Sequence, residues 1–212
     1  LGYAEADPTE DVGGADAAAK MAILASIAFH SRVLIDDVPY EGIDGLQAAD
    51  IAHADALGFV VKLVGVARLL HGAVSVRVYP ALVPRGHRLA AIGGSDNAVL
   101  LESRATREIM LVGPGAGGDE TASAVLADIL SVLGTQQGSF LHNALADAGR
   151  PIAPPGAVPS AFYLRTEVAD RPGVLARIAS IFADEDLSIL SVVQSGSGDE
   201  ASLVLILHEG LE

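Results

Sequence analysis

The chain has 212 residues, of which 50% are hydrophobic and 19% charged, which is enough apolar surface for one or two folded domains. Thirteen Lys and Arg against 27 Asp and Glu give a formal net charge of −14, which argues against nucleic acid and anionic membranes as partners. Every apolar stretch is interrupted well before the roughly 18 residues that a membrane span needs.

The cysteine and histidine content excludes further kinds of functional site. Cysteine is absent, which excludes disulfides, thiolate nucleophiles and cysteine-bound metals and fits a cytoplasmic location. The six histidines are scattered without ligand spacing, so we expect no metal site. The first residues, LGYAEADP, contain neither an initiating Met nor a signal peptide, and we expect the chain to be part of a longer protein.

A proline-rich segment predicts the domain organisation. Residues 150–160 hold four of the ten prolines, which favours an extended, semi-rigid, exposed linker. We therefore expect one domain over residues 1–149 and a second over residues 161–212.

The first domain alternates helical and strand-like segments. Alanine, methionine and leucine favour helices, and alternating branched residues favour strands. The expected helices are 15–29, 46–57 and 121–133, and the expected strands are 59–66, 74–83, 98–102 and 108–112. These segments predict an α/β (α+β) fold, with a mixed sheet and packed helices.

In the second domain, the sequence predicts a smaller module with the order strand, helix, strand, strand. The expected segments are strand 162–168, helix 174–184, strand 188–194 and strand 201–207, with a turn at 170–173. They are the first four elements of a ferredoxin-like split βαβ fold. The module lacks the last helix and strand of that fold unless another segment or chain supplies them.

Asp16 and Lys20 are the first candidate functional pair. They are four residues apart on a predicted helix, so their side chains are neighbours. Such pairs are commonly exposed and contribute little to stability. Lys20, one of only two lysines, precedes an apolar run, so we expect it to be partly buried and tuned as a proton donor. The acidic residues before it, including Glu5, suit a helix N-terminus or a substrate ammonium group.

The segment 113–118, GPGAGG, runs from a predicted strand into a predicted helix. Glycine lets backbone N–H groups approach an anion, and the start of a helix favours negative charge. The segment matches neither a Walker loop nor a dinucleotide fingerprint, so a tight turn explains it equally well.

These segments together resemble a known family. The run GYAEADPTEDVGGADAAAKMAILASIAF resembles the signature of homoserine dehydrogenases, and GPGAGGDETASAVLADIL is similar to the glycine-rich segment of that family. After the linker, RTEVADRPGVLARIASIFADEDLSILSVVQSG is similar to an ACT regulatory domain.

The resemblance implies an NAD(P)-dependent oxidoreductase that interconverts L-aspartate 4-semialdehyde and L-homoserine, in threonine and methionine biosynthesis. Lys20 would donate and accept the proton, and Asp16 would orient Lys20 and hold the substrate hydroxyl. Three further substrate contacts and two cofactor contacts are implied: Glu5, Tyr3 and Asp11 for the substrate, and Gly115 and Gly117 for the cofactor. The cofactor would be held mainly by a nucleotide-binding domain that precedes this sequence in the family, so we expect this chain alone to be inactive.

For the second domain, the resemblance implies feedback regulation by a small amino acid, for which threonine is the candidate. The implied effector site is the turn Asp170, Arg171, Pro172, Gly173, Val174 and Leu175. Exposed sheet edges favour a homodimer or tetramer.

Two other functions are weighed against the dehydrogenase. The first is an amino-acid-sensing module without catalysis of its own. The second is a hydrolase that uses Glu5 and Asp16 as a carboxylate pair, which the absence of Trp and the 4% aromatic content disfavour for a sugar substrate.

Overall fold

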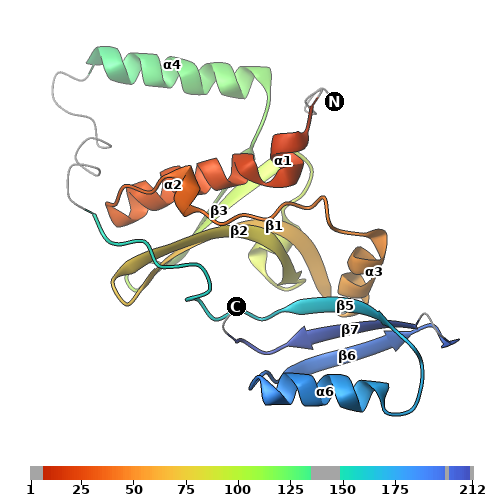
Figure 1. Ribbon diagram of the computed structural model, residues 1–212. Helices are drawn as coiled ribbons and strands as arrows, with labels where there is room; N and C mark the ends of the chain where they lie inside the picture. Colours follow the sequence, from red (N-terminus) through yellow and green to blue (C-terminus); the bar gives the residue numbers. More distant parts are fainter. Residues whose placement is uncertain (1–6, 135–148, 199–200, 211–212) are drawn as a thin grey trace. The chain divides into compact units, whose positions relative to one another are not determined.

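The computed structural model describes residues 7–134, 149–198 and 201–210 (Figure 1). The chain forms two compact units. The first contains residues 1–46 and 54–152, and the second contains residues 47–53 and 153–212. Within the described ranges, every helix is too short or too polar to form a membrane span.

The centre of the first unit is a long hairpin with a helix packed on it (Figure 1). Strands β1 (Phe59–Leu70) and β2 (Ala73–Pro84) pair antiparallel along their whole length. The two residues between them, His71 and Gly72, have φ values of 50° and 88°, which suits a two-residue hairpin turn.

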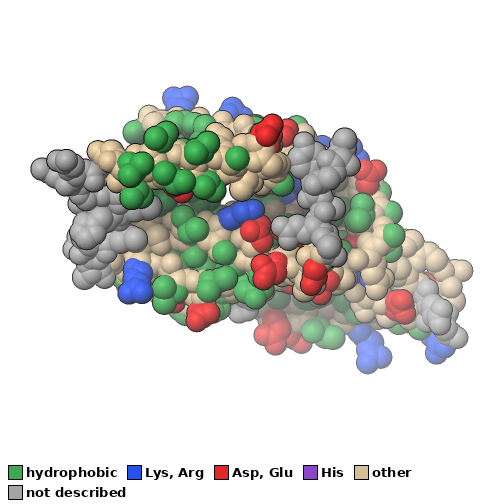
Figure 2. All heavy atoms as spheres, turned by 90° about the horizontal axis from the view of Figure 1, so that it is seen from above, with side chains coloured by type: hydrophobic (Ala, Val, Ile, Leu, Met, Phe, Trp, Pro, Cys, Tyr) green, Lys and Arg blue, Asp and Glu red, His purple; other side chains and the backbone are tan. Residues whose placement is uncertain are grey.

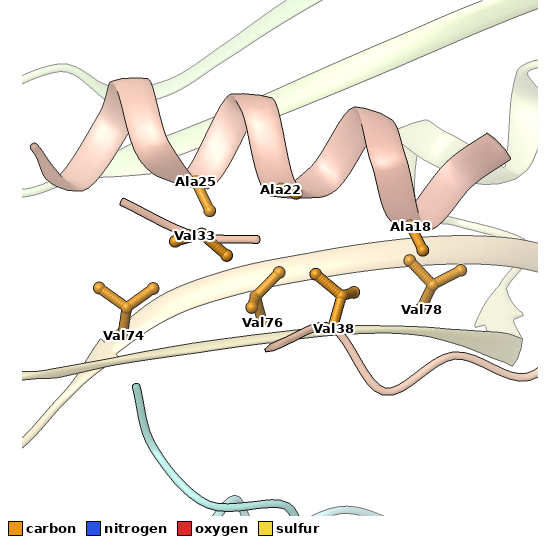
Figure 3. Packing of buried hydrophobic residues seen from close by; sticks show 8 residues of the cluster. All are labelled: Ala18, Ala22, Ala25, Val33, Val38, Val74, Val76 and Val78. Carbon is orange, nitrogen blue, oxygen red and sulfur yellow. The ribbon is translucent and has the colours of Figure 1, made fainter. Parts of the chain in front are cut away.

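Helix α2 (Ala15–Phe29) covers this hairpin with an alanine face. Ala18, Ala22 and Ala25 recur at helical spacing and are at most 6% exposed (Figure 3). They face alternate valines of β2, at positions 74, 76 and 78, together with Val33 and Val38. Because these side chains are small, the backbone of α2 packs close to β2.

Shorter elements complete the first unit. Helix α1 (Thr9–Gly13) precedes α2, and a second antiparallel hairpin, β3 (Asp96–Ser103) and β4 (Arg107–Pro114), leads into helix α4 (Gly118–Gly134). Two 3₁₀ helices, η1 (Ile35–Asp37) and η2 (Arg88–Ala91), lie in the connections.

The second unit is a three-stranded antiparallel sheet with the order β5-β7-β6. Its elements are β5 (Tyr163–Val168), α6 (Val174–Asp184), β6 (Ile189–Ser195) and β7 (Ala201–Leu207). Leu203, Leu205 and Leu207 of β7 are fully buried on one face, against Ile178 and Phe182 of α6. The unit is thus the βαββ module that the sequence predicts, and its other face carries the even-numbered residues of β7.

The proline-rich segment is less exposed than expected. The carbonyl of Pro151 accepts a hydrogen bond from Val74 N–H (2.8 Å), and Ile152 packs against the core of the first unit. Val158 is only 3% exposed. Proline lacks an N–H, but its carbonyl can still accept a hydrogen bond from a strand edge, and Pro151 and Ile152 form an isolated bridge with β2 at Val74.

Candidate active site

Asp16 and Lys20 form the predicted pair on α2. Lys20 Nζ lies 2.5 Å from Asp16 Oδ2. The side chains are 53% exposed for Lys20 and 38% for Asp16, so the expectation that Lys20 is partly buried was wrong. The physical reason is the narrow buried face of α2: alanines contact the sheet, whereas Lys20 lies on the side that faces outward.

The start of α2 is fixed by glycines and by the loop that follows η1. Gly14 adopts a left-handed conformation (φ 86°), and a Cβ there would come within 3.2 Å of the Glu41 carbonyl oxygen. Ile43 N–H donates to the Val12 carbonyl (2.8 Å), and Glu41 N–H donates to the Val78 carbonyl (2.9 Å). The loop at residues 41–43 therefore links α1, just before the start of α2, to strand β2.

Strand β1 sets the position of the next turn of α2. Met21, beside Lys20, packs directly over Gly65, where a Cβ would overlap the Met21 side chain. A residue larger than glycine at this position would push the helix or its methionine away from the sheet.

The acidic segment before α2 is described in part. Tyr3 and Glu5 lie outside the described residues. Asp11 is exposed on α1. Asp7 accepts hydrogen bonds from Thr9 Oγ1 (2.5 Å) and Thr9 N–H (3.1 Å), and these bonds, the hydroxyl first, hold the pKa of Asp7 below its usual value. A surface hollow beside α1 is lined by Pro8, Thr9, Val12, Gly13 and Asp44.

The glycine-rich turn between β4 and α4 is closely packed by polar side chains. A Cβ on Gly115 would overlap the Asn97 amide, and a Cβ on Gly117 (φ 137°) would overlap the Glu120 carboxylate. Gly115 N–H donates to the Ser95 carbonyl (2.9 Å). The backbone conformation of Gly117 therefore favours glycine, and a side chain at Gly115 would require Asn97 to move.

The predicted effector turn joins β5 to α6 in the second unit. Gly173 has a φ of 89° and precedes the first turn of α6. Asp170 accepts a hydrogen bond from Gln194 Nε2 on β6 (2.8 Å), and its N–H donates to the Gly198 carbonyl (2.7 Å). Arg171, Pro172 and Leu175 are exposed, and Val174 is half-buried.

A buried carboxylate in the second unit was not predicted. Asp50 accepts hydrogen bonds from Tyr163 Oη (2.8 Å) and Arg165 Nε (2.6 Å). Burial alone raises the pKa of Asp50, but hydrogen bonds from Arg165, from the Gln47 N–H and from Tyr163 outweigh it and hold the pKa below its usual value. Burial and the neighbouring carboxylate raise the pKa of Tyr163 to about 12.

No pattern in the sequence joins these residues, because 113 positions separate Asp50 from Tyr163. The only signal in the sequence was that Tyr163 and Arg165 are two positions apart on a predicted strand, so their side chains share one face of it. Among the described residues, no three His, Asp or Glu side chains converge closely enough to bind a metal ion.

Comparison with known protein families matches both units. The pattern described as "Homoserine dehydrogenase" matches residues 1–130, and the pattern described as "ACT domain" matches residues 162–210.

Individual relatives agree with the family match. Homoserine dehydrogenase of Mycobacterium tuberculosis strain H37Rv is 47% identical over 220 residues, which cover 98% of this chain and 50% of the relative. The enzyme of the same name from Corynebacterium glutamicum is 43% identical and covers 100% of this chain, which spans 49% of that relative. This chain thus spans about half the length of these curated relatives.

Solved structures show the same fold. A crystal structure of a homoserine dehydrogenase from Thiobacillus denitrificans superposes with a TM-score of 0.88 at 39% identity, and covers 100% of this chain and 50% of that chain. A homoserine dehydrogenase structure from S. aureus gives a TM-score of 0.70 at 30% identity, over 98% of this chain and 49% of that chain. The chain belongs to the homoserine dehydrogenase family, and its C-terminal unit is an ACT domain.

Proposed function

We propose that the full protein oxidises L-homoserine to L-aspartate 4-semialdehyde, and catalyses the reverse reduction, with NAD(P) as the cofactor. The observation that carries this proposal is the Asp16–Lys20 pair at 2.5 Å on a helix that lies within the matched family segment. Both side chains are accessible enough to meet a substrate, and the helix beneath them is fixed to the sheet.

Lys20 is the proton-transfer group of the proposed reaction. In the oxidation, its neutral amine takes the proton of the substrate hydroxyl as the carbon bearing that hydroxyl loses a hydride. In the reduction, its ammonium returns the proton to the forming alkoxide. Asp16 accepts a hydrogen bond from Lys20 Nζ and so orients the amine toward the substrate hydroxyl, whose single proton is the one that Lys20 takes and returns. The cofactor, when bound, accepts or supplies the hydride.

The turn with Gly115 and Gly117 is the part of this chain that fits the cofactor. Glycine at both positions leaves the backbone of the turn without side chains of its own, and the neighbouring side chains of Asn97 and Glu120 pack against it. The first turn of α4 carries Asp119 and Glu120, which repel phosphate groups but favour the positively charged ring of an oxidised nicotinamide. These two glycines would therefore face the nicotinamide end of the cofactor, and its phosphates would be held by the nucleotide-binding domain.

The substrate ammonium group is assigned to the acidic segment before α2. Glu5 and Tyr3 would bind the amino-acid head group, the latter through its backbone, with Asp11 as a supporting charge. An ammonium group requires an anionic partner, and this segment is the acidic stretch next to Asp16 in the sequence.

The ACT domain is proposed to bind threonine as a feedback inhibitor at the turn from Asp170 to Leu175, in a homodimer or tetramer. The turn is exposed, ordered by Gln194 and Gly198, and lies at the start of α6, whose N–H groups are suited to a carboxylate. Calorimetric titration of L-threonine into the full protein tests this assignment, and an absence of binding heat would contradict it.

The catalytic proposal is tested by homoserine oxidation, followed as NAD(P)H absorbance, in the protein that carries its upstream half. We expect Lys20→Ala to lower kcat on the order of 100-fold or more, the cost of a lost general acid and base. The matched control is Lys62→Ala, because Lys62 is the only other lysine and donates to the Ile92 carbonyl away from α2. Thermal unfolding of both variants checks that the fold is retained.

Each result has a distinct meaning. Unchanged kcat in Lys20→Ala would show that Asp16 and Lys20 are an ordinary surface ion pair. Absence of homoserine oxidation in the wild-type protein would favour the alternative function, an amino-acid-sensing protein without catalysis of its own. Activity in the 212-residue chain alone would contradict the proposal that the upstream half is required.

A further inference from the structure

Asn97, near the start of β3, lies over the glycine turn that leads into α4. Its side-chain amide is so close to Gly115 that a Cβ on Gly115 would overlap it. Asn97 pairs in register with Gly113 on β4, and Gly115 N–H donates to the Ser95 carbonyl (2.9 Å). The hairpin therefore fixes the position of this amide beside the turn, through contacts that all lie within the first unit.

The surface of the chain next to the Asn97 amide is open. Residues that pair across two strands present their side chains on the same face of the sheet, and Gly113, the partner of Asn97, has no side chain. A Cβ on Gly113 would have no atom within 4 Å. Asn97 and Gly115 are both exposed. A ligand can thus approach the amide on this face of the hairpin.

The Asn97 amide has hydrogen-bonding groups to offer such a ligand. An asparagine side chain carries two N–H donors and one carbonyl acceptor. Within the described ranges, none of these groups has a hydrogen-bond partner in the protein. Packing and backbone pairing therefore hold the amide in place, and its polar atoms remain available.

Glu120 is the other polar side chain that packs on this turn. Its carboxylate lies over Gly117, where a Cβ would overlap it. A carboxylate only accepts hydrogen bonds, whereas the Asn97 amide donates and accepts at the same time. A primary carboxamide also has a carbonyl oxygen and an NH2 group, so it can form two hydrogen bonds with the Asn97 amide. Nicotinamide carries such a carboxamide.

We propose, on the basis of the function proposed above, that Asn97 is a cofactor-binding residue that binds the carboxamide of the nicotinamide ring. Its N–H donates to the carboxamide oxygen, and its carbonyl accepts from the carboxamide N–H. Gly115, which has no Cβ, makes room for the Asn97 amide, and Gly113 leaves open space beside it. Two hydrogen bonds fix the orientation of the ring as well as its position, so Asn97 helps to place the carbon that exchanges the hydride.

Binding of NAD(P)H to the full protein, followed by the fluorescence of the reduced cofactor, is the first test. Asn97→Leu keeps a side chain of similar size over Gly115 but cannot form hydrogen bonds, and Asn97→Ala removes the side chain beyond Cβ. We expect both variants to raise the Kd about tenfold, which corresponds to about 1.4 kcal/mol. Thermal unfolding checks that each variant retains the fold.

Gln47→Ala is the matched control for this measurement. It removes another exposed amide, just before helix α3 (Ala48–Ala56) and outside the β3–β4 hairpin. The Kd for NAD(P)H should stay within about twofold of wild type, because the removal of an exposed amide has little effect away from the cofactor. In homoserine oxidation, the Asn97 variants should raise the KM for NAD(P) about tenfold and leave the KM for homoserine within about twofold of wild type.

A cofactor analogue distinguishes recognition of the carboxamide from a structural role of Asn97. The 3-acetylpyridine analogue of NAD(P) has a methyl group in place of the carboxamide NH2, so it cannot donate to the Asn97 carbonyl. In wild type the analogue should bind more weakly than NAD(P), with both Kd values measured by competition with NAD(P)H. The ratio of these two Kd values should fall about threefold or more in both Asn97 variants. A residue that only shaped the turn would weaken both cofactors equally and leave the ratio unchanged.

The outcomes separate this proposal from the proposed function. An unchanged Kd for NAD(P)H, or the same analogue ratio in wild type and variants, would overturn the role of Asn97 and leave the dehydrogenase assignment intact. A wild-type protein that shows the expected dependence on Asn97 but does not oxidise homoserine would contradict the proposed reaction and support the carboxamide contact. A wild-type protein that does not bind NAD(P)H would contradict both.

Discussion

Asp50 keeps its charge in surroundings where burial alone would favour the neutral acid. Hydrogen bonds from Arg165, Gln47 and Tyr163 hold its pKa below the usual value, so the ionised form is favoured in the folded protein. A lowered pKa contributes stability that is fully present above the pKa of the unfolded chain and is lost as the pH falls through the folded value.

This linkage predicts an acid-sensitive contribution to the stability of the ACT unit. At pH 7 we expect Asp50→Asn to lower the free energy of unfolding by about 1–3 kcal/mol, the cost of an impaired buried hydrogen-bond network. The difference from wild type should shrink as the pH is lowered below about 5. Urea unfolding followed by circular dichroism at a series of pH values measures it.

Asp7→Asn is the control for this experiment, because Asp7 also has a lowered pKa but is exposed. We expect only a small effect from it at any pH. A difference between Asp50→Asn and wild type that stayed constant from pH 7 to pH 3 would show that the charge of Asp50 does not contribute to stability.

At the scale of elements, Met21, the neighbour of Lys20 in the proposed catalytic pair, packs on Gly65. Gly65→Ala would place a methyl group where the Met21 side chain lies. We expect a loss of about 1–3 kcal/mol in stability, as for other insertions into a packed contact, and a decrease in kcat, because Lys20 is next to Met21 on α2. Thermal unfolding and homoserine oxidation measure the two effects.

Gly45→Ala is a suitable control, since a Cβ at Gly45 would have no atom within 4 Å. The double variant Gly65→Ala with Met21→Ala removes the overlapping side chain and should recover part of the activity. Equal kcat values for Gly65→Ala and wild type would show that β1 does not determine the position of Lys20.

The elements also show what the sequence could and could not predict. Helix 15–29, helix 174–184 and strand 201–207 were predicted with the bounds that the structure has, because alanine content, helical periodicity and β-branched runs are local signals. The exposure of Lys20 was predicted wrongly, since the apolar run after it was taken as a sign that Lys20 is partly buried, whereas only the alanine face of the helix is covered.

Contacts between distant segments were beyond sequence reasoning. The grouping of residues 47–53 with the ACT sheet joins segments more than 100 positions apart, and a single sequence carries no information on such pairs. Helix α1, with five residues, is too short for a periodic pattern.

At the scale of the whole molecule, the described structure leaves one long helix uncovered. No residue of α4 is buried, and six of its large apolar side chains are between 49% and 77% exposed. They are Val125, Leu126, Ile129, Leu130, Val132 and Leu133. Hydrophobic side chains gather over this helix in the space-filling view of Figure 2. Monomeric proteins rarely expose a continuous apolar surface of this kind, so α4 requires a partner surface.

Because the chain spans about half of its relatives, we expect the other half of the protein to cover this helix. The 212-residue chain alone should then bind a hydrophobic dye such as ANS and associate with itself, whereas the full protein should do neither at the same concentration. Leu126→Glu with Leu130→Glu should reduce dye binding by the short chain and weaken the full protein, since the same surface is then charged.

A matched substitution tests whether dye binding depends on α4 or on any exposed apolar side chain. Leu69→Glu removes a single leucine that is 45% exposed near the tip of the β1–β2 hairpin, and it should change dye binding little. If the full protein bound as much dye as the short chain, α4 would be uncovered in both, and the rest of the protein would have to dock elsewhere. The position of the glycine turn relative to the cofactor would then lose its support, because that turn leads directly into α4.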